Sequence, residues 1–185
     1  GVGDGAREAF GTTAGLKDKF GDRVIDAPVC ENTLTGWCIG MAMCGYYPIL
    51  THQRADFALA SFDQLVNHAA IFEETYGQQI PFLVRMIVGR GWGNGSQHTK
   101  DLYPILHRIR GLHVLRSCTA EEAYGNIIQA PTVKSPVIVI EYRHLFDHSD
   151  RVADKVLDSV QWAPASRPLE EAFYLKSDDQ FKGPY

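Results

Sequence analysis

The sequence is poor in cysteine, and its cysteines are badly spaced for metal binding. Cys30, Cys38, Cys44 and Cys118 form no C-x-x-C pair. Zinc sites and disulfide frameworks depend on regular cysteine spacing, so the pattern argues against both. We predict four reduced and mostly buried thiols. No catalytic role is assigned to Cys30, because no histidine lies near it in the sequence.

Long apolar runs and basic clusters are missing as well. The longest apolar stretches, such as Phe82 to Val88 and Pro136 to Ile140, fall far short of the roughly 20 residues that cross a bilayer. The net charge is −4 and the basic residues are scattered, which argues against a nucleic-acid surface. The first residues show no signal-peptide pattern, so we expect a cytoplasmic protein with neither membrane nor nucleic-acid partners.

Size and composition indicate one globular unit. A chain of 185 residues with 45% hydrophobic content can bury one sizeable core but is too short for two large domains. Residues 1–148 carry a regular pattern of secondary structure and are assigned to one domain. After Asp150 the chain becomes charged and contains three prolines, so residues 149–185 are predicted to be an appendage and not a separate domain.

Strand and helix patterns alternate along the first 148 residues. Helical spacing predicts helices that stop at Gly21, Gly45 and Gly77, the last of them over residues 62–77. Thr119 with Glu122 has the capping-box pattern of another helix start. Short apolar runs typical of buried strands lie at residues 23–30, 47–51, 81–88, 112–115 and 137–141. This alternation predicts a three-layer α/β/α fold around a mainly parallel sheet.

Glu31 stands where the first strand pattern ends and a glycine-rich helix pattern begins. In open α/β sheets, ligands bind in the crevice at the carboxyl ends of the strands. A functional carboxylate is one interpretation of Glu31, and an ordinary acidic residue favoured by the helix dipole is the other. Gln53 and Phe57 follow the next strand, and His98 follows the one after it. All four are therefore predicted to lie at one edge of the sheet.

The segment Gly89 to Gly95 has four glycines in seven residues. Such a loop lets the backbone approach a ligand closely, although a flexible connector has the same composition. Trp92 within the loop and His98 just after it favour a structured wall beside a ligand.

Three longer motifs together resemble a known family. They read DAPVCENTLTG over residues 26–36, FDQLVNHAA over residues 62–70 and GRGWGNGSQHT over residues 89–99. In this order they are similar to the pyrimidine-binding domain of thiamine diphosphate enzymes. The resemblance is strongest to the beta subunit of the decarboxylating component of 2-oxoacid dehydrogenase complexes, such as the pyruvate dehydrogenase complex. It implies the transketolase-like thiamine-diphosphate-binding fold for the first 146 residues.

The resemblance also implies roles for five residues. The glutamate matching Glu31 binds a ring nitrogen of the cofactor's aminopyrimidine and favours the imino tautomer that activates the thiazolium carbon. Phe57 matches the ring that stacks on the aminopyrimidine, and Val29 would pack beside it. Gln53 is implied to bind the cofactor, and His98 is implied to donate or orient a proton near the substrate as a catalytic residue.

The resemblance implies partners as well. A pyrimidine-binding domain holds half of the family's site, so thiamine diphosphate and its Mg²⁺ would be shared with a diphosphate-binding alpha-type subunit in an α2β2 heterotetramer. A lipoyl acyltransferase core is an optional further partner. The sequence departs from the family at both ends, since we expect its usual N-terminal helix and first strand to be missing before Gly1 and its C-terminal domain to be missing after Phe146.

A second motif imitates the metal site of the partner domain. Gly3-Asp4-Gly5 is followed at some distance by Asn32. That motif requires a strand leading into the Gly-Asp-Gly turn and another ending at the asparagine, and neither condition is met. No metal-ligating residue is therefore predicted in this chain.

Three functional hypotheses follow. The leading one is a subunit of a thiamine-diphosphate-dependent 2-oxoacid dehydrogenase, decarboxylase or transketolase-like enzyme that is active only with its partner chain. The second is a noncatalytic assembly or regulatory subunit that has retained the fold. The third is a small stand-alone 2-oxoacid decarboxylase subunit with a single-domain partner.

Overall fold

Four parallel strands form the centre of the molecule. The computed structural model describes residues 11–147 apart from residues 90, 92 and 94. Within this part, the sheet has the order β1-β2-β4-β3, and all three neighbouring pairs are parallel. The strands are β1 (Ile49–His52), β2 (Leu83–Val88), β3 (His113–Ser117) and β4 (Val137–Tyr142). The predicted parallel sheet is confirmed, with the last strand placed inside it and not at its edge.

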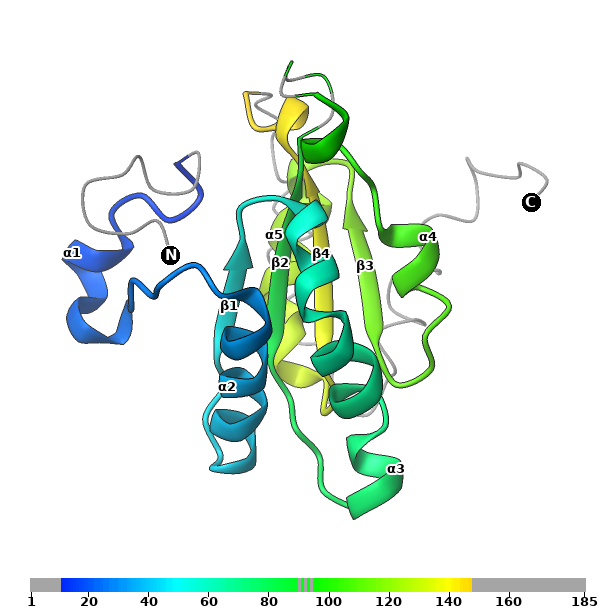
Figure 1. The fold of residues 1–185 in the computed structure, drawn as a ribbon. Coiled ribbons are helices and arrows are strands. Elements are labelled where there is room, and N and C mark those ends of the chain that lie inside the picture. The colour runs from blue at the N-terminus through cyan, green and yellow to red at the C-terminus, as the bar shows by residue number, and fades with distance from the viewer. Residues whose placement is uncertain (1–10, 90, 92, 94, 148–185) are drawn as a thin grey trace.

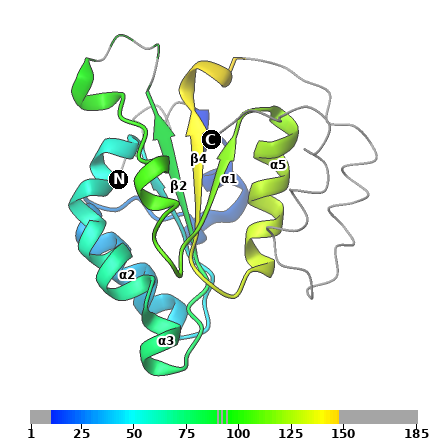
Figure 2. The same cartoon turned by 90° about the vertical axis from the view of Figure 1, so that its right-hand side faces the viewer.

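Helices cover both faces of the sheet, so the predicted three layers are confirmed (Figures 1 and 2). One face carries α2 (Glu31–Met43), the 3-10 helix η3 (Ala55–Ser61), the π-helix η4 (Gln64–Ala69) and α3 (Phe72–Tyr76). The other face carries α5 (Ala120–Gln129). The short α1 (Leu16–Phe20) lies off the β1 edge of the sheet, and α4 (Tyr103–Leu106) packs against β3.

The core occupies both sides of the two central strands. Val84, Met86 and Val88 of β2 belong to the larger hydrophobic cluster under α2, η3 and η4, whereas Leu83 belongs to a smaller cluster that includes Ala130 just after α5. Side chains alternate between the two faces of a strand, so a strand buried on both faces needs an unbroken apolar run. This explains the apolar character of Pro136 to Ile140 and of Phe82 to Val88, where the only exception is Arg85, whose charge is paired with Glu141.

The predicted strand over residues 23–30 is wrong. Arg23 ends a 3-10 helix (Gly21–Arg23), and residues 24–30 form an irregular segment. A strand is stabilised by pairing with a neighbour, and this segment pairs with none of the four strands described. Ile25 and Val29 consequently remain exposed.

The predicted glycine stops are confirmed, but the helix expected over residues 62–77 is interrupted. Gly21, Gly45 and Gly77 all adopt positive φ angles at or just after helix ends, a conformation that glycine adopts without steric cost. Between residues 55 and 77 the chain passes from a 3-10 helix through a π-helix to α3. The π segment lies where Gln64 contacts α2, since a Cβ atom at Gly36 would stand 3.1 Å from the Gln64 Oε1 atom.

The capping box of α5 is confirmed. Thr119 Oγ1 accepts a hydrogen bond from the Glu122 amide at 3.1 Å, and the Glu122 carboxylate accepts one from the Cys118 amide at 2.7 Å. The first bond satisfies a backbone donor that the helix start leaves unpaired, and the second ties the Glu122 side chain to the residue before the N-cap.

The prediction of mostly buried thiols is wrong. All four cysteines are free, but only Cys38 is buried, where desolvation raises its pKa to about 11. The other three stand at the ends of helices or strands, outside the core. Hydrogen bonds from Thr33 lower the pKa of the exposed Cys30 thiol.

The described residues include no helix that is long and apolar enough to cross a membrane. Gly3-Asp4-Gly5, Trp92 and the predicted appendage at residues 149–185 lie outside the described residues, so the domain boundary at residue 148 stays a prediction.

Candidate functional site

Three segments meet at the carboxyl ends of β1 and β2. The chain leaves β1 into η3, and it leaves β2 through the glycine-rich loop into η5 (Ser96–His98). Helix α2 begins at the same end of the sheet and packs against η3 (Figure 1). This is the edge at which parallel sheets bind ligands. The structure therefore gathers the helix start at Glu31, the segment with Phe57 and the segment with His98 at one edge, as the sequence predicted.

Glu31 is the first residue of α2, and its side chain is half-buried. Its backbone carbonyl accepts a hydrogen bond from Thr35 Oγ1 at 2.8 Å. Its carboxylate has no hydrogen bond or ion pair with any other described residue. The N-terminal end of the helix stabilises negative charge there, so Glu31 offers a free acceptor to a ligand without needing a protein partner.

The rings of Phe57 and His98 are in direct contact. Their centroids lie 5.6 Å apart with an interplanar angle of 81°, the edge-to-face geometry that aromatic rings prefer. Phe57 is 36% exposed although its neighbours Asp56 and Ala58 are both buried. A large apolar ring left accessible between buried neighbours can stack a planar ligand group.

Gly89 holds the His98 backbone in place. A Cβ atom at Gly89 would collide with the carbonyl oxygen of His98. The segment just after β2 and the end of η5 therefore touch through their backbones, which is why this position of the glycine-rich loop must lack a side chain. Within the described part of the molecule, the His98 Nδ1 atom is buried without a hydrogen-bond partner.

The positions of Gln53 and Val29 give less support to a role in cofactor binding. Gln53 directly follows β1 and is half-buried at the same edge, which agrees with its predicted position. Val29 is 72% exposed in the irregular segment before α2 and has no packing role within the described residues. Its predicted cofactor contact, like that of Gln53, stays a prediction.

Three further residues near this edge, Asp56, Lys100 and His52, were not predicted from the sequence. Asp56 lies in η3 with a side chain only 5% exposed, and Lys100 Nζ lies 3.3 Å from its Oδ1 atom. His52 is the buried last residue of β1. The acidic residue inside the apolar run Ala55–Ala58 was a signal for Asp56. No pattern in the sequence pointed to Lys100, which is 44 residues away.

Burial lowers the pKa of His52 from its ordinary value of 6.5 to about 4. The neutral imidazole is therefore the native form, and protonation favours the unfolded chain. Stability from this residue is complete above pH 6.5 and is lost as the pH falls toward 4. A shift of this size corresponds to about 3 kcal/mol of unfolding free energy between pH 7 and pH 4.

We therefore expect His52→Phe to weaken the pH dependence of unfolding across this range. Urea denaturation at several pH values measures the effect. The matched control is His107→Gln, because His107 is exposed and should leave the wild-type pH dependence intact. An unchanged pH profile in His52→Phe would contradict the burial argument.

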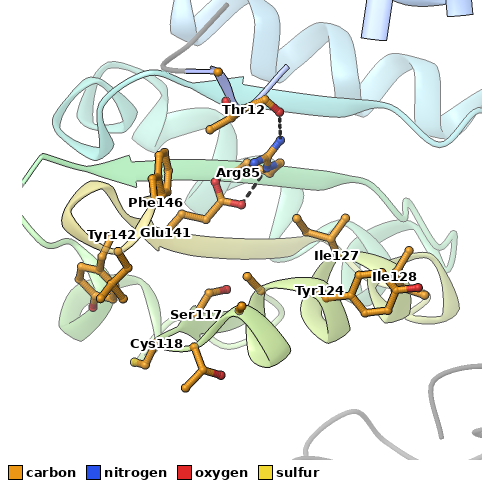
Figure 3. A pocket seen from close by; sticks show the side chains of 15 residues that line it. Thr12, Arg85, Ser117, Cys118, Tyr124, Ile127, Ile128, Glu141, Tyr142 and Phe146 are labelled. Atoms are coloured by element: carbon orange, nitrogen blue, oxygen red, sulfur yellow. Dashed lines mark hydrogen bonds and ion pairs between the residues drawn. The ribbon is translucent and has the colours of Figure 1, made fainter. Parts of the chain in front are cut away.

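A cavity of about 650 Å³ lies on the opposite face of the sheet from α2, with one wall formed by α5 (Figure 3). It contains none of the predicted site residues. Its polar floor is a bidentate ion pair in which Arg85 Nε and Nη2 donate to the Glu141 oxygens at 2.9 and 2.8 Å, while Nη1 donates to the Thr12 carbonyl at 3.3 Å. The charges of Arg85 and Glu141 compensate each other, so neither needs a ligand. We therefore assign this cavity a structural role and not a catalytic one.

Among the described residues, no three histidine, cysteine, aspartate or glutamate side chains gather in a way that could hold a metal ion. His144 is exposed and its ring contacts Tyr142. The carboxyl edge thus presents the Glu31 carboxylate, the accessible Phe57 ring, His98 and Gln53.

The chain is similar to several known proteins. Residues 2–148 match the family model described as the transketolase, pyrimidine binding domain. The chain is 37% identical over 149 residues to the beta subunit of acetoin:2,6-dichlorophenolindophenol oxidoreductase from Cupriavidus necator, covering 77% of this chain and 44% of the relative. It is 34% identical over 171 residues to the chloroplastic pyruvate dehydrogenase E1 component subunit beta-2 from Arabidopsis thaliana, covering 90% and 42%.

A solved structure shares the fold. It is described as a split gene transketolase, inactive beta4 tetramer, and aligns with a TM-score of 0.59 at 19% identity, covering 74% of this chain and 42% of that chain. In each of these three comparisons, the chain spans less than half the length of the relative.

Proposed function

Because this chain belongs to the transketolase pyrimidine-binding domain family, we propose that it supplies the pyrimidine-binding half of a thiamine-diphosphate-dependent enzyme of the 2-oxoacid dehydrogenase E1 beta type. The observation that carries the proposal is the Glu31 carboxylate, which has no partner among the described residues and lies at the helix start beside the segment that carries Phe57. Relatives named as beta subunits of pyruvate dehydrogenase and acetoin oxidoreductase support the same reaction class.

The residues at this edge fit an aminopyrimidine. A ring nitrogen needs a carboxylate with a free oxygen, which Glu31 provides. A flat heterocycle needs an accessible aromatic or apolar surface, which Phe57 provides at 36% exposure. When bound, thiamine diphosphate supplies the electron sink for decarboxylation of a 2-oxo acid.

The chain's own residues have three tasks in this proposal. Glu31 shares a proton with the cofactor's ring nitrogen, and the partly desolvated helix start strengthens that hydrogen bond. Phe57 orients the ring by stacking. His98, held against Phe57, holds or donates a proton near the substrate.

The remaining half of the site is assigned to another chain. We propose that a diphosphate-binding alpha-type subunit holds the diphosphate and its Mg²⁺, and that the two chains assemble as an α2β2 heterotetramer. The chain alone is then inactive.

Reconstitution tests this function. The full chain is mixed with a diphosphate-binding alpha-type chain, thiamine diphosphate and Mg²⁺, and a 2-oxo acid is supplied with 2,6-dichlorophenolindophenol as electron acceptor. We expect dye reduction only when both chains are present. Complex formation without dye reduction or release of carbon dioxide, across a panel of 2-oxo acids, would overturn the proposal and favour the noncatalytic alternative.

A further inference from the structure

One ion pair ties together two segments that are distant in sequence. Lys100 follows η5 and donates twice to Asp56 Oδ1 in η3, once from its backbone nitrogen and once from Nζ, both at 3.3 Å. The same Nζ donates to the Ser96 carbonyl at 3.0 Å. Lys100 thus contacts Ser96 at the start of η5 and Asp56 on the neighbouring segment.

The two segments held together carry the ring pair of the candidate site. Phe57 is the residue after Asp56, and His98 lies two residues before Lys100. Their edge-to-face contact at 5.6 Å sits directly beside the ion pair. The carbonyl of His98 also rests against Gly89, so the backbone at His98 is confined on a second side.

The burial of the two partners is unequal. The Asp56 side chain is 5% exposed and the Lys100 side chain 50% exposed. Asp56 Oδ2 is buried without a hydrogen-bond partner in the described part of the chain. Arg54 also lies near Asp56 and remains as a counter-charge when Lys100 is replaced. Since the Lys100 side chain is half-exposed, removing its charge should release η5 from η3 and leave the rest of the fold in place.

We propose that Asp56 and Lys100 are positioning residues that set the place of His98 relative to Phe57. This inference rests on the proposed function for its catalytic meaning, although the tethering of η5 is a property of the chain alone. Misplacing a catalytic group by about 1 Å can cost about a hundredfold in rate, so a tether of this kind acts on turnover more than on substrate binding.

Hydrogen exchange on the full chain tests the tether without any partner. Lys100→Met keeps the length of the side chain and removes its charge. We expect the amides of residues 96–100 to exchange about tenfold faster, which corresponds to a tenfold larger open population, with the urea midpoint close to wild type. Lys134→Met, at an exposed lysine, is the matched control and should change neither quantity.

Kinetics of the reconstituted enzyme test the consequence. In Lys100→Met we expect kcat to fall by about ten- to a hundredfold with a smaller change in KM, and Lys100→Arg to restore most of the loss. Asp56→Asn should lower kcat similarly, and the double variant Asp56→Asn/Lys100→Met should be no worse than the poorer single variant, because the residues act as one unit.

Hydrogen exchange and kinetics together distinguish a failure of the positioning role from a failure of the proposed function. Unchanged exchange at residues 96–100 in Lys100→Met, or additive kinetic losses in the double variant, would overturn the positioning role. If the wild-type assembly shows no turnover, the proposed function fails while the exchange data still judge the tether. If Asp56→Asn fails to fold, Lys100→Met and Lys100→Arg decide the question alone.

Discussion

Glu31→Gln is expected to lower turnover of the reconstituted enzyme by about a factor of 10² to 10⁴, the usual contribution of a positioned acid or base. Glutamine keeps the shape of the side chain and can still accept a hydrogen bond, but it cannot share a proton with the cofactor's ring nitrogen. The loss should therefore appear in kcat more than in KM for the 2-oxo acid.

The matched control is Glu121→Gln. Glu121 is likewise a half-buried glutamate in the first turn of a helix, in this case α5 on the other face of the sheet. Both variants lose the same favourable interaction with a helix dipole, so both should show a similar small change in stability. Only Glu31→Gln should lose activity, and undiminished turnover in that variant would remove Glu31 from the mechanism.

Arg85→Met is expected to produce the largest loss of stability, about 3–5 kcal/mol of unfolding free energy. The Arg85 and Glu141 side chains are 13% and 5% exposed and form a bidentate pair on the floor of the cavity. Methionine leaves the Glu141 carboxylate buried without its counter-charge. Urea denaturation measures the change as a shift of the midpoint at constant slope.

Two further variants isolate the cause. Arg85→Met/Glu141→Met removes both charges from the floor of the cavity and should recover much of the loss, because an apolar pair needs no compensation. Arg110→Met breaks an ion pair with Glu74 whose side chains are 88% and 65% exposed, and should change stability by less than about 1 kcal/mol. A double variant that is less stable than Arg85→Met would contradict this account.

Patterns within short stretches of sequence were sufficient for much of the fold. The start of α5 at its Thr119 cap and the stop of α3 at Gly77 both follow from local backbone chemistry. The apolar runs that became β2 and β4 follow from burial on both faces. Local rules succeeded there because the interacting atoms are only a few residues apart.

Local sequence patterns failed where a secondary-structure element depends on a neighbouring element of the same chain. Residues 23–30 have a strand-like composition but pair with no described strand, and composition does not reveal whether a neighbour is present. The helix expected over residues 62–77 gave way to 3-10, π and α segments, and the π segment is the part that packs against α2; tertiary contacts of this kind are not visible in local helix preference.

The sequence by itself determined the four strands that form the sheet, the family, and the edge of the sheet at which Glu31, Phe57 and His98 gather. Only the tertiary structure placed β4 between β2 and β3 and brought together Arg85 with Glu141 and Asp56 with Lys100. These pairs are separated by 56 and 44 residues. A charge interaction depends on distance in space, and that distance exists only after the strands have paired and the loops at their ends have met.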